Sequence, residues 1–191
     1  MALVMTSAPP SEPITVEAAK AHLRVDGTAE DVLIGSLILT SRLHIEAALS
    51  LALIDQGWIL RLDRWPRSNE IEIPLSPLKS VTSVRVKTGS EGWIAVPQTS
   101  YLIDLVSKPP RLVWNAATRP DPGVQAAGIE IAFDAGFGPT CAHVPAPIRH
   151  ALLLLIAHWY EHREAIEVGS DATRIPDAVC DLIAPFRKIR L

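Results

Sequence analysis

The pattern of hydrophobic and polar residues changes twice along the chain. Up to about residue 52, and again from about residue 141, apolar residues recur at intervals near 3.6, which is typical of amphipathic helices. From residue 53 to 140 they alternate every second residue, which is typical of half-buried strands. The pattern predicts an α+β fold, in which residues 1–52 and 141–191 form one helical core around a β-rich, antiparallel insertion at 53–140.

The first stretch predicts two helices joined by a short turn. Thr15 is a plausible N-cap for a helix over 16–23, which is rich in helix-forming residues. A second helix is expected from about residue 29 to 51. Its buried stripe should consist of Ile34, Leu37, Ile38, Ile45, Ala48 and Leu49. Arg42, His44 and Glu46 lie off that stripe.

The middle stretch predicts seven short strands separated by proline and glycine turns. They are expected near residues 58–63, 71–73, 81–87, 93–96, 101–106, 111–114 and 129–133. The run Gly136-Phe137-Gly138 follows the last strand and lacks the lysine and hydroxyl residue of a phosphate-binding loop. It therefore predicts a tight turn.

The last stretch predicts a long helix and a short one. Pro147 suits a first helical position, and a wide apolar face runs from Ile148 to Ile166. A shorter helix is expected from Pro176 to about Phe186.

Composition excludes some classes of protein. The chain has 191 residues, is 48% hydrophobic and carries a net charge of −3, whereas disorder needs low hydrophobicity and high net charge. Its longest apolar run, Ala151 to Ala157, falls well short of the about 20 residues of a membrane span. We therefore expect no membrane partner. The two cysteines do not form a disulfide framework.

One motif could carry chemistry. The run from His158 to His162 fits H-x-x-E-H, an inverted zinc-peptidase signature, in which His158 and His162 would bind zinc and Glu161 would activate water. A third ligand would have to come from residues that follow no recognisable pattern: Glu167, Asp171, Asp177 or Asp181. Packing and surface roles explain the same residues. The sequence therefore predicts no enzyme and no catalytic, cofactor or metal residue, with a zinc hydrolase as the alternative.

Charge is unevenly distributed. Residues 1–52 carry −3, residues 53–140 carry zero and residues 141–186 carry −3, whereas the last five residues carry +3. Such a tail can be solvated and complement the dipole of the preceding helix, or it can bind nucleic acid. It can also be a docking peptide. The docking hypothesis assigns the contacts to Phe186, Arg187, Lys188, Ile189, Arg190 and Leu191.

Several segments together resemble one family. They are residues 14–25, the strand at 58–66, the stretch 73–81, the turn at 133–138, and the run 144–155 with its continuation through 158–164. In this order and spacing they resemble the head–tail connector proteins, also called adaptor or head-completion proteins, of tailed bacteriophages and gene transfer agents. The resemblance covers about residues 14 to 186.

This resemblance implies a structural protein of the virion. Such connectors form a ring, typically a dodecamer, beneath the portal protein, and DNA passes through its channel without sequence-specific binding. The resemblance implies that the C-terminal segment docks on the portal and that a stopper or tail connector protein binds the opposite side. It also implies assembly in the host cytoplasm, and no cofactor.

Overall fold

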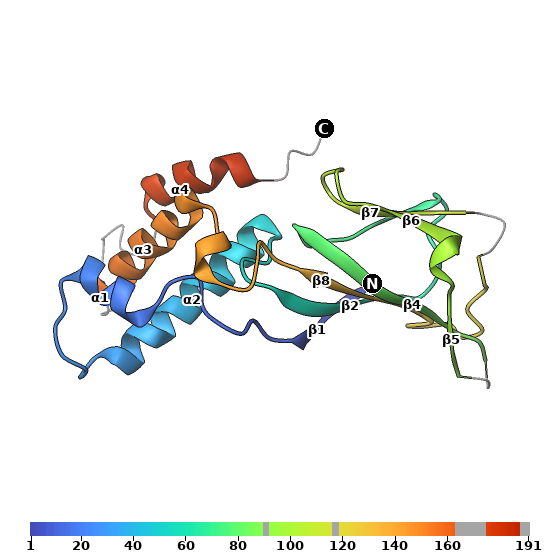
Figure 1. The fold of residues 1–191 in the computed structure, drawn as a ribbon, viewed down its shortest axis with the longest axis horizontal. Helices are drawn as coiled ribbons and strands as arrows, with labels where there is room; N and C mark the ends of the chain where they lie inside the picture. Colours follow the sequence, from blue (N-terminus) through green and yellow to red (C-terminus); the bar gives the residue numbers. More distant parts are fainter. Residues whose placement is uncertain (90–91, 116–118, 163–174, 188–191) are drawn as a thin grey trace, which may run out of the picture. The chain divides into compact units, whose positions relative to one another are not determined.

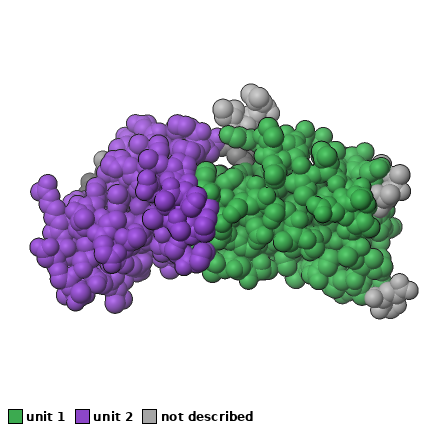
Figure 2. Space-filling view, in the orientation of Figure 1, with its two compact units in different colours: residues 1–9, 50–137 green, residues 10–49, 138–191 purple. Residues whose placement is uncertain are grey.

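The computed structural model describes residues 1–89, 92–115, 119–162 and 175–187. The chain divides into two compact units, coloured separately in Figure 2. Unit 1 comprises residues 1–9 and 50–137, and unit 2 comprises residues 10–49 and 138–191. The described residues hold four α-helices and two antiparallel sheets, so the predicted α+β class is confirmed.

Unit 1 contains all the strands of the described chain (Figure 1). One sheet has five strands in the order β1 (Ala2–Ser7), β2 (Gln56–Leu62), β8 (Ile129–Ala135), β4 (Leu78–Lys87) and β5 (Trp93–Ala95). The second has three strands in the order β3 (Glu70–Glu72), β7 (Arg111–Trp114) and β6 (Tyr101–Asp104). Every neighbouring pair is antiparallel.

Side chains from both sheets form the core of unit 1. On β8, Ile129, Ile131 and Phe133 are buried in this core, as period-two alternation requires of one sheet face. The second sheet contributes Leu112 and Trp114. The ring of Trp114 lies 4.5 Å from that of Trp65 and 5.5 Å from that of Tyr101, measured between centroids. These aromatic contacts add stacking to the area buried.

Each of the seven predicted strands has a counterpart, but the N-terminus was misassigned. The sequence assigned residues 1–52 to the helical part, whereas residues 2–7 form strand β1, which pairs with β2 at the edge of the larger sheet. A short apolar run followed by Thr6 and Ser7 has no periodicity of its own. Its conformation comes from a partner more than fifty residues away.

Unit 2 contains the helices α1 (Val16–Leu23), α2 (Asp31–Leu49), α3 (Ala146–Glu161) and α4 (Asp177–Ile183), the last followed by a 3-10 turn over Ala184–Phe186. Within this unit α3 packs against both α2 and α4 (Figure 1). Thr15 caps α1 as predicted, because its hydroxyl oxygen accepts a hydrogen bond from the amide of Ala18 at 3.1 Å. The core is apolar: Ile34, Ile38, Ile45, Ile148, Leu152, Leu155, Ile156 and Val179.

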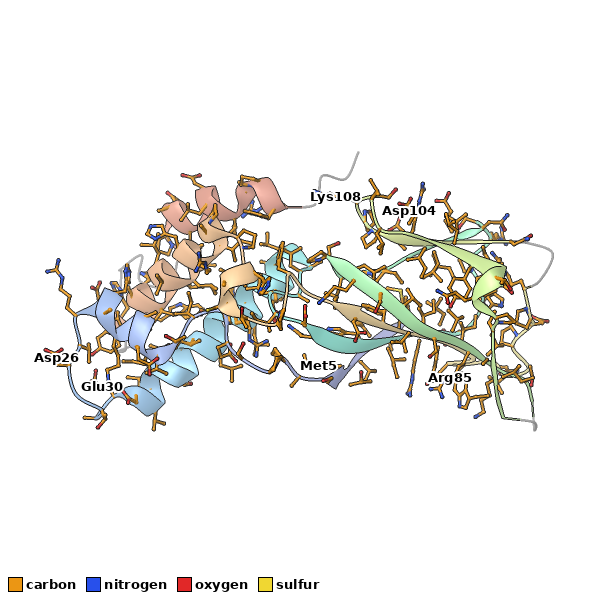
Figure 3. All side chains as sticks on the ribbon, viewed as in Figure 1. Met5, Asp26, Glu30, Arg85, Asp104 and Lys108 are labelled. Carbon is orange, nitrogen blue, oxygen red and sulfur yellow. The ribbon has the colours of Figure 1, made fainter. Side chains whose placement is uncertain are left out.

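Side chains of α1 and α3 both bind residues at the start of α2. Lys20 of α1 forms an ion pair of 2.8 Å with Asp31, and the hydroxyl of Tyr160 in α3 donates a hydrogen bond to Glu30. The Asp31 side chain therefore binds a neighbouring helix. The loop that precedes α2 includes Asp26 and Glu30, which Figure 3 labels.

The buried face of α2 differs from the predicted stripe. Arg42 and Glu46, expected off the stripe, are buried, and Ala48, expected on it, is exposed. Arg42 Nε lies 2.7 Å from a carboxylate oxygen of Glu12, and its Nη1 lies 2.9 Å from Glu46. Burial works against the charged guanidinium, but these bonds and charges outweigh it and raise the pKa of Arg42. The partner Glu12 lies outside the helix, so helical periodicity could not reveal the pair.

Candidate functional site

The predicted zinc signature lies at the end of α3. His162 is the C-cap residue, and its backbone amide donates to the carbonyl oxygen of His158. The imidazole Nδ1 of His162 also lies 2.8 Å from that oxygen. The two imidazole centroids are 4.6 Å apart. Both nitrogen contacts satisfy a carbonyl that the ending helix would otherwise leave unpaired.

The other residues of the signature have separate surroundings. Trp159 meets His44 of α2 edge-to-face, with centroids 5.9 Å apart, and Glu161 is exposed. Asp177 and Asp181 are exposed on α4, whereas Glu167 and Asp171 lie outside the described residues. Across the ranges that the structure describes, no three His, Cys, Asp or Glu side chains are grouped to hold a metal ion. The geometry therefore gives the zinc alternative no support.

The predicted docking tail is described only at its start. Phe186 is half-buried at the end of the 3-10 turn, and Arg187 is exposed in an extended conformation. Lys188, Ile189, Arg190 and Leu191 lie outside the described residues. The docking role of the tail therefore stays a prediction.

The outer face of α2 is exposed and carries no charged residue. Its exposed positions include no Asp, Glu, Lys or Arg; they are Val32, Ser36, Leu39, Thr40, Leu43, His44, Ala47 and Ala48. Val32 is 88% exposed, and Leu39 and Leu43 lie seven and eleven positions further along the same side. The charged Arg42 and Glu46 are on the buried side. This inverts the usual helix, which turns its charges to water and its leucines inward.

The apolar character of α2 also bears on the expectation of no membrane partner. By length and composition α2 could cross a membrane, a feature that the search for uninterrupted apolar runs missed. Core helices of soluble proteins meet the same criterion. Here the helix packs against α1 and α3 and holds a buried ion pair.

Unit 1 exposes a second apolar feature at the turn between β6 and β7. Val106 is 90% exposed, and Leu105 and Leu102 are also exposed. The Asp104 carboxylate holds this turn, because it accepts hydrogen bonds from the amides of Val106 and Ser107, from the Ser107 hydroxyl and from Arg111 Nε, at 2.6 to 3.1 Å. Figure 3 labels Asp104 and Lys108 on this hairpin. The turn is thus preorganised to present an apolar tip.

Asp104→Asn should loosen that tip. The hydrogen bonds from Ser107 and Arg111 hold the pKa of Asp104 well below its usual range. Because the pKa of Asp104 is lower in the folded than in the unfolded chain, its carboxylate stabilises the turn at every pH above the unfolded-state pKa of about 3.9. This stabilisation is lost only as the pH falls through the lower pKa of the folded state. The amides of Val106 and Ser107 should stay protected from hydrogen exchange at pH 3 in the parent chain.

In Asp104→Asn the same two amides should exchange faster at neutral pH, whereas amides of β2 and β8 should not change. Asp121→Asn is a matched control, since Asp121 is an exposed loop carboxylate of the same unit. Unchanged protection in Asp104→Asn would show that the carboxylate does not order the turn.

Comparison with known proteins identifies similar structures. No protein-family model matches the chain, and no curated protein matches it. The chain is similar to a chain in the neck of an empty gene transfer agent particle computed with C6 symmetry, with a TM-score of 0.84. The two sequences are 27% identical, and the match covers 100% of this chain and 97% of the other. A chain of the native gene transfer agent virion has the same identity and coverage and a TM-score of 0.83, and one in the native particle neck computed with C12 symmetry has a TM-score of 0.73. These three similar structures are thus chains of a gene transfer agent virion or its neck.

Proposed function

We propose that this chain is a structural head–tail connector, or adaptor, of a tailed phage or gene transfer agent. The observation that carries the proposal is the full-length similarity of both units to chains of a particle neck. A match to one unit alone would support only a shared module. Because the similarity covers both the helical unit and the β unit, it supports a shared place in the particle.

The proposed assembly is a ring around the channel through which DNA leaves the capsid, with twelve copies beneath the portal protein. The neck structures with C6 and C12 symmetry support a cyclic arrangement. The net charge of −3 suits such a channel, because many cationic contacts to phosphates would hold DNA in place. The portal would bind one side of the ring, and a stopper or tail connector protein would bind the other.

The proposal is tested by mixing the full chain with the portal protein of its own particle. Native mass spectrometry and electron microscopy should show twelve copies in a closed ring on each portal. A chain that stays unbound at concentrations well above those in an assembling cell, or that binds without forming a ring, would contradict the proposal.

The tail is tested in the same assay. Deletion of residues 187–191 should weaken portal binding at least tenfold and leave the melting temperature unchanged, because Arg187 is exposed. Two partial variants separate the contributions: Arg187, Lys188 and Arg190 to Gln, or Ile189 and Leu191 to Ser. Portal binding equal to that of the parent after the deletion would reject the docking role.

A further inference from the structure

We infer that the uncharged outer face of α2 is a contact between neighbouring copies of this chain in the ring. The inference rests on the proposed function and adds to it the surface that builds the ring. Its residues, named here the α2 face, are Val32, Ser36, Leu39, Thr40, Leu43, His44, Ala47 and Ala48.

The first argument is the distribution of charge on the helix. Charged residues of α2 could reach water if the helix were turned about its axis, yet Arg42 is buried to 5% exposure of its side chain and Glu46 to 10%. Burying such a pair costs desolvation energy, and a second ion pair, of 2.7 Å between Arg42 and Glu12, offsets part of that cost. Because this pair lies on the buried side of the helix, Leu39, Leu43 and Val32 on the opposite side are exposed. This arrangement suits a helix whose outer face is covered in the assembled protein.

The second argument is the size of the face. From Val32 to Ala48 the helix rises about 24 Å, and a helix face is roughly 10 Å wide, which gives about 240 Å² in projection. A stable interface between two proteins buries about 800 Å² on each partner. The α2 face alone is therefore too small to hold a free dimer. It is suited to copies already held side by side, as in a ring on a portal.

The third argument is symmetry. In a cyclic ring every copy meets two identical neighbours through two different surfaces. The similar neck structures have C6 and C12 symmetry. Both surfaces are repeated around the ring, so an unpaired charged residue on either of them would be desolvated once in every copy. A face without Asp, Glu, Lys or Arg avoids that cost.

Other occupants fit the α2 face less well. DNA would require cations, and the face has none. Helices that lie in a membrane surface carry Lys and Arg along their polar side, whereas the half-buried charges at the start of α2 are Glu30 and Asp31, and the charges Arg42 and Glu46 within the helix are buried. A second copy of the chain is the occupant that these charges favour.

The test introduces a charge on the α2 face of the full chain and measures assembly on the portal. Leu39→Lys and Leu43→Lys keep good helix formers at exposed positions, so each melting temperature should stay within about 2 °C of the parent. Each should reduce ring formation at least tenfold, because every contact around the ring carries the lysine. Ala21→Lys is the matched control, since Ala21 is exposed on α1 of the same unit; it should assemble as the parent does.

A crosslinking measurement identifies the occupant independently of stability. A photoreactive residue at position 39 should join two copies of this chain in the assembled neck, and one at position 21 should not. Parent-like rings from both leucine variants would overturn the inference. Crosslinks from position 39 to the portal or to another neck protein would also overturn it. So would crosslinks from position 39 to lipid when the chain is mixed with vesicles and floated through a density gradient. If the parent chain itself forms no ring on the portal, the proposed function fails together with the inference. If the parent and both lysine variants form rings equally well, the inference fails alone.

Discussion

Arg42→Met should lower the stability of unit 2 by about 3 kcal/mol, because it removes the guanidinium that forms a buried ion pair with the carboxylate of Glu46. This value is at the lower end of the about 3–5 kcal/mol that breaking a buried ion pair costs. The reason is that Glu12, the second partner of Arg42, is partly exposed and can be hydrated. Urea unfolding followed by circular dichroism at 222 nm measures the effect, because all the described α-helices belong to unit 2.

The double variant Arg42→Met with Glu46→Leu is the control for this prediction. Replacing both charges by apolar groups of similar volume should recover most of the loss, because no desolvated charge remains on the helix. Two single losses that simply add in the double variant would mean that Arg42 and Glu46 act independently. In that case the buried pair would not explain why α2 turns its charges inward.

Gly136→Ala should destabilise unit 1 by about 3 kcal/mol. Gly136 has a φ of +149°, which side chains rarely adopt, and a Cβ there would lie 2.6 Å from the backbone nitrogen and Cα of Asp55. Strain at such a position and a clash with backbone each cost about 1–3 kcal/mol. Tryptophan fluorescence during urea unfolding reports on this unit, because Trp58, Trp65, Trp93 and Trp114 lie in it.

Gly35→Ala provides the matched control for Gly136→Ala. Gly35 lies inside α2, and a Cβ there would meet no atom within 4 Å. The same substitution should therefore stabilise unit 2 by about 1 kcal/mol through helix propensity. A Gly136→Ala midpoint equal to that of the parent would show that the backbone shifts freely at this turn.

The sequence predicted the elements well where they are regular and local. The period-two runs located seven strands, and the helices α1, α2 and α4 occur where the sequence predicted them. The helix α3 also begins as predicted but ends at Glu161, before Ile166, to which its apolar face was expected to run. The run Gly136-Phe137-Gly138 was also predicted to be a tight turn. The backbone of Asp55 lies so close to Gly136 that there is no room for a Cβ at this position. Each of these features depends on neighbours in the chain or on a repeated pattern.

The prediction was wrong where long-range partners decide. Strand β1 has no periodic signal and exists because β2 offers it an unpaired edge. The zinc signature, which the sequence analysis kept only as the alternative, gets no support from the structure, since His162 caps α3 and Trp159 packs against His44. The α2 face was missed because the periodicity was used only to find the buried stripe, and Val32, Leu39 and Leu43 lie outside that stripe.

By itself the sequence determined the α+β class, the order of the segments and the resemblance to connectors, because local periodicity and the order of motifs can be read directly from the sequence. The predicted stripe residues Ile34, Ile38, Ile45 and Leu49 are buried, but only the tertiary structure decided that Arg42 and Glu46 are buried beside them. Arg42 can enter the interior because Glu12 reaches it from outside the helix, and the leucines on the opposite side are then left exposed. Charge pairing across thirty residues is set by the fold, and in this protein it determines which surface is free to meet another chain.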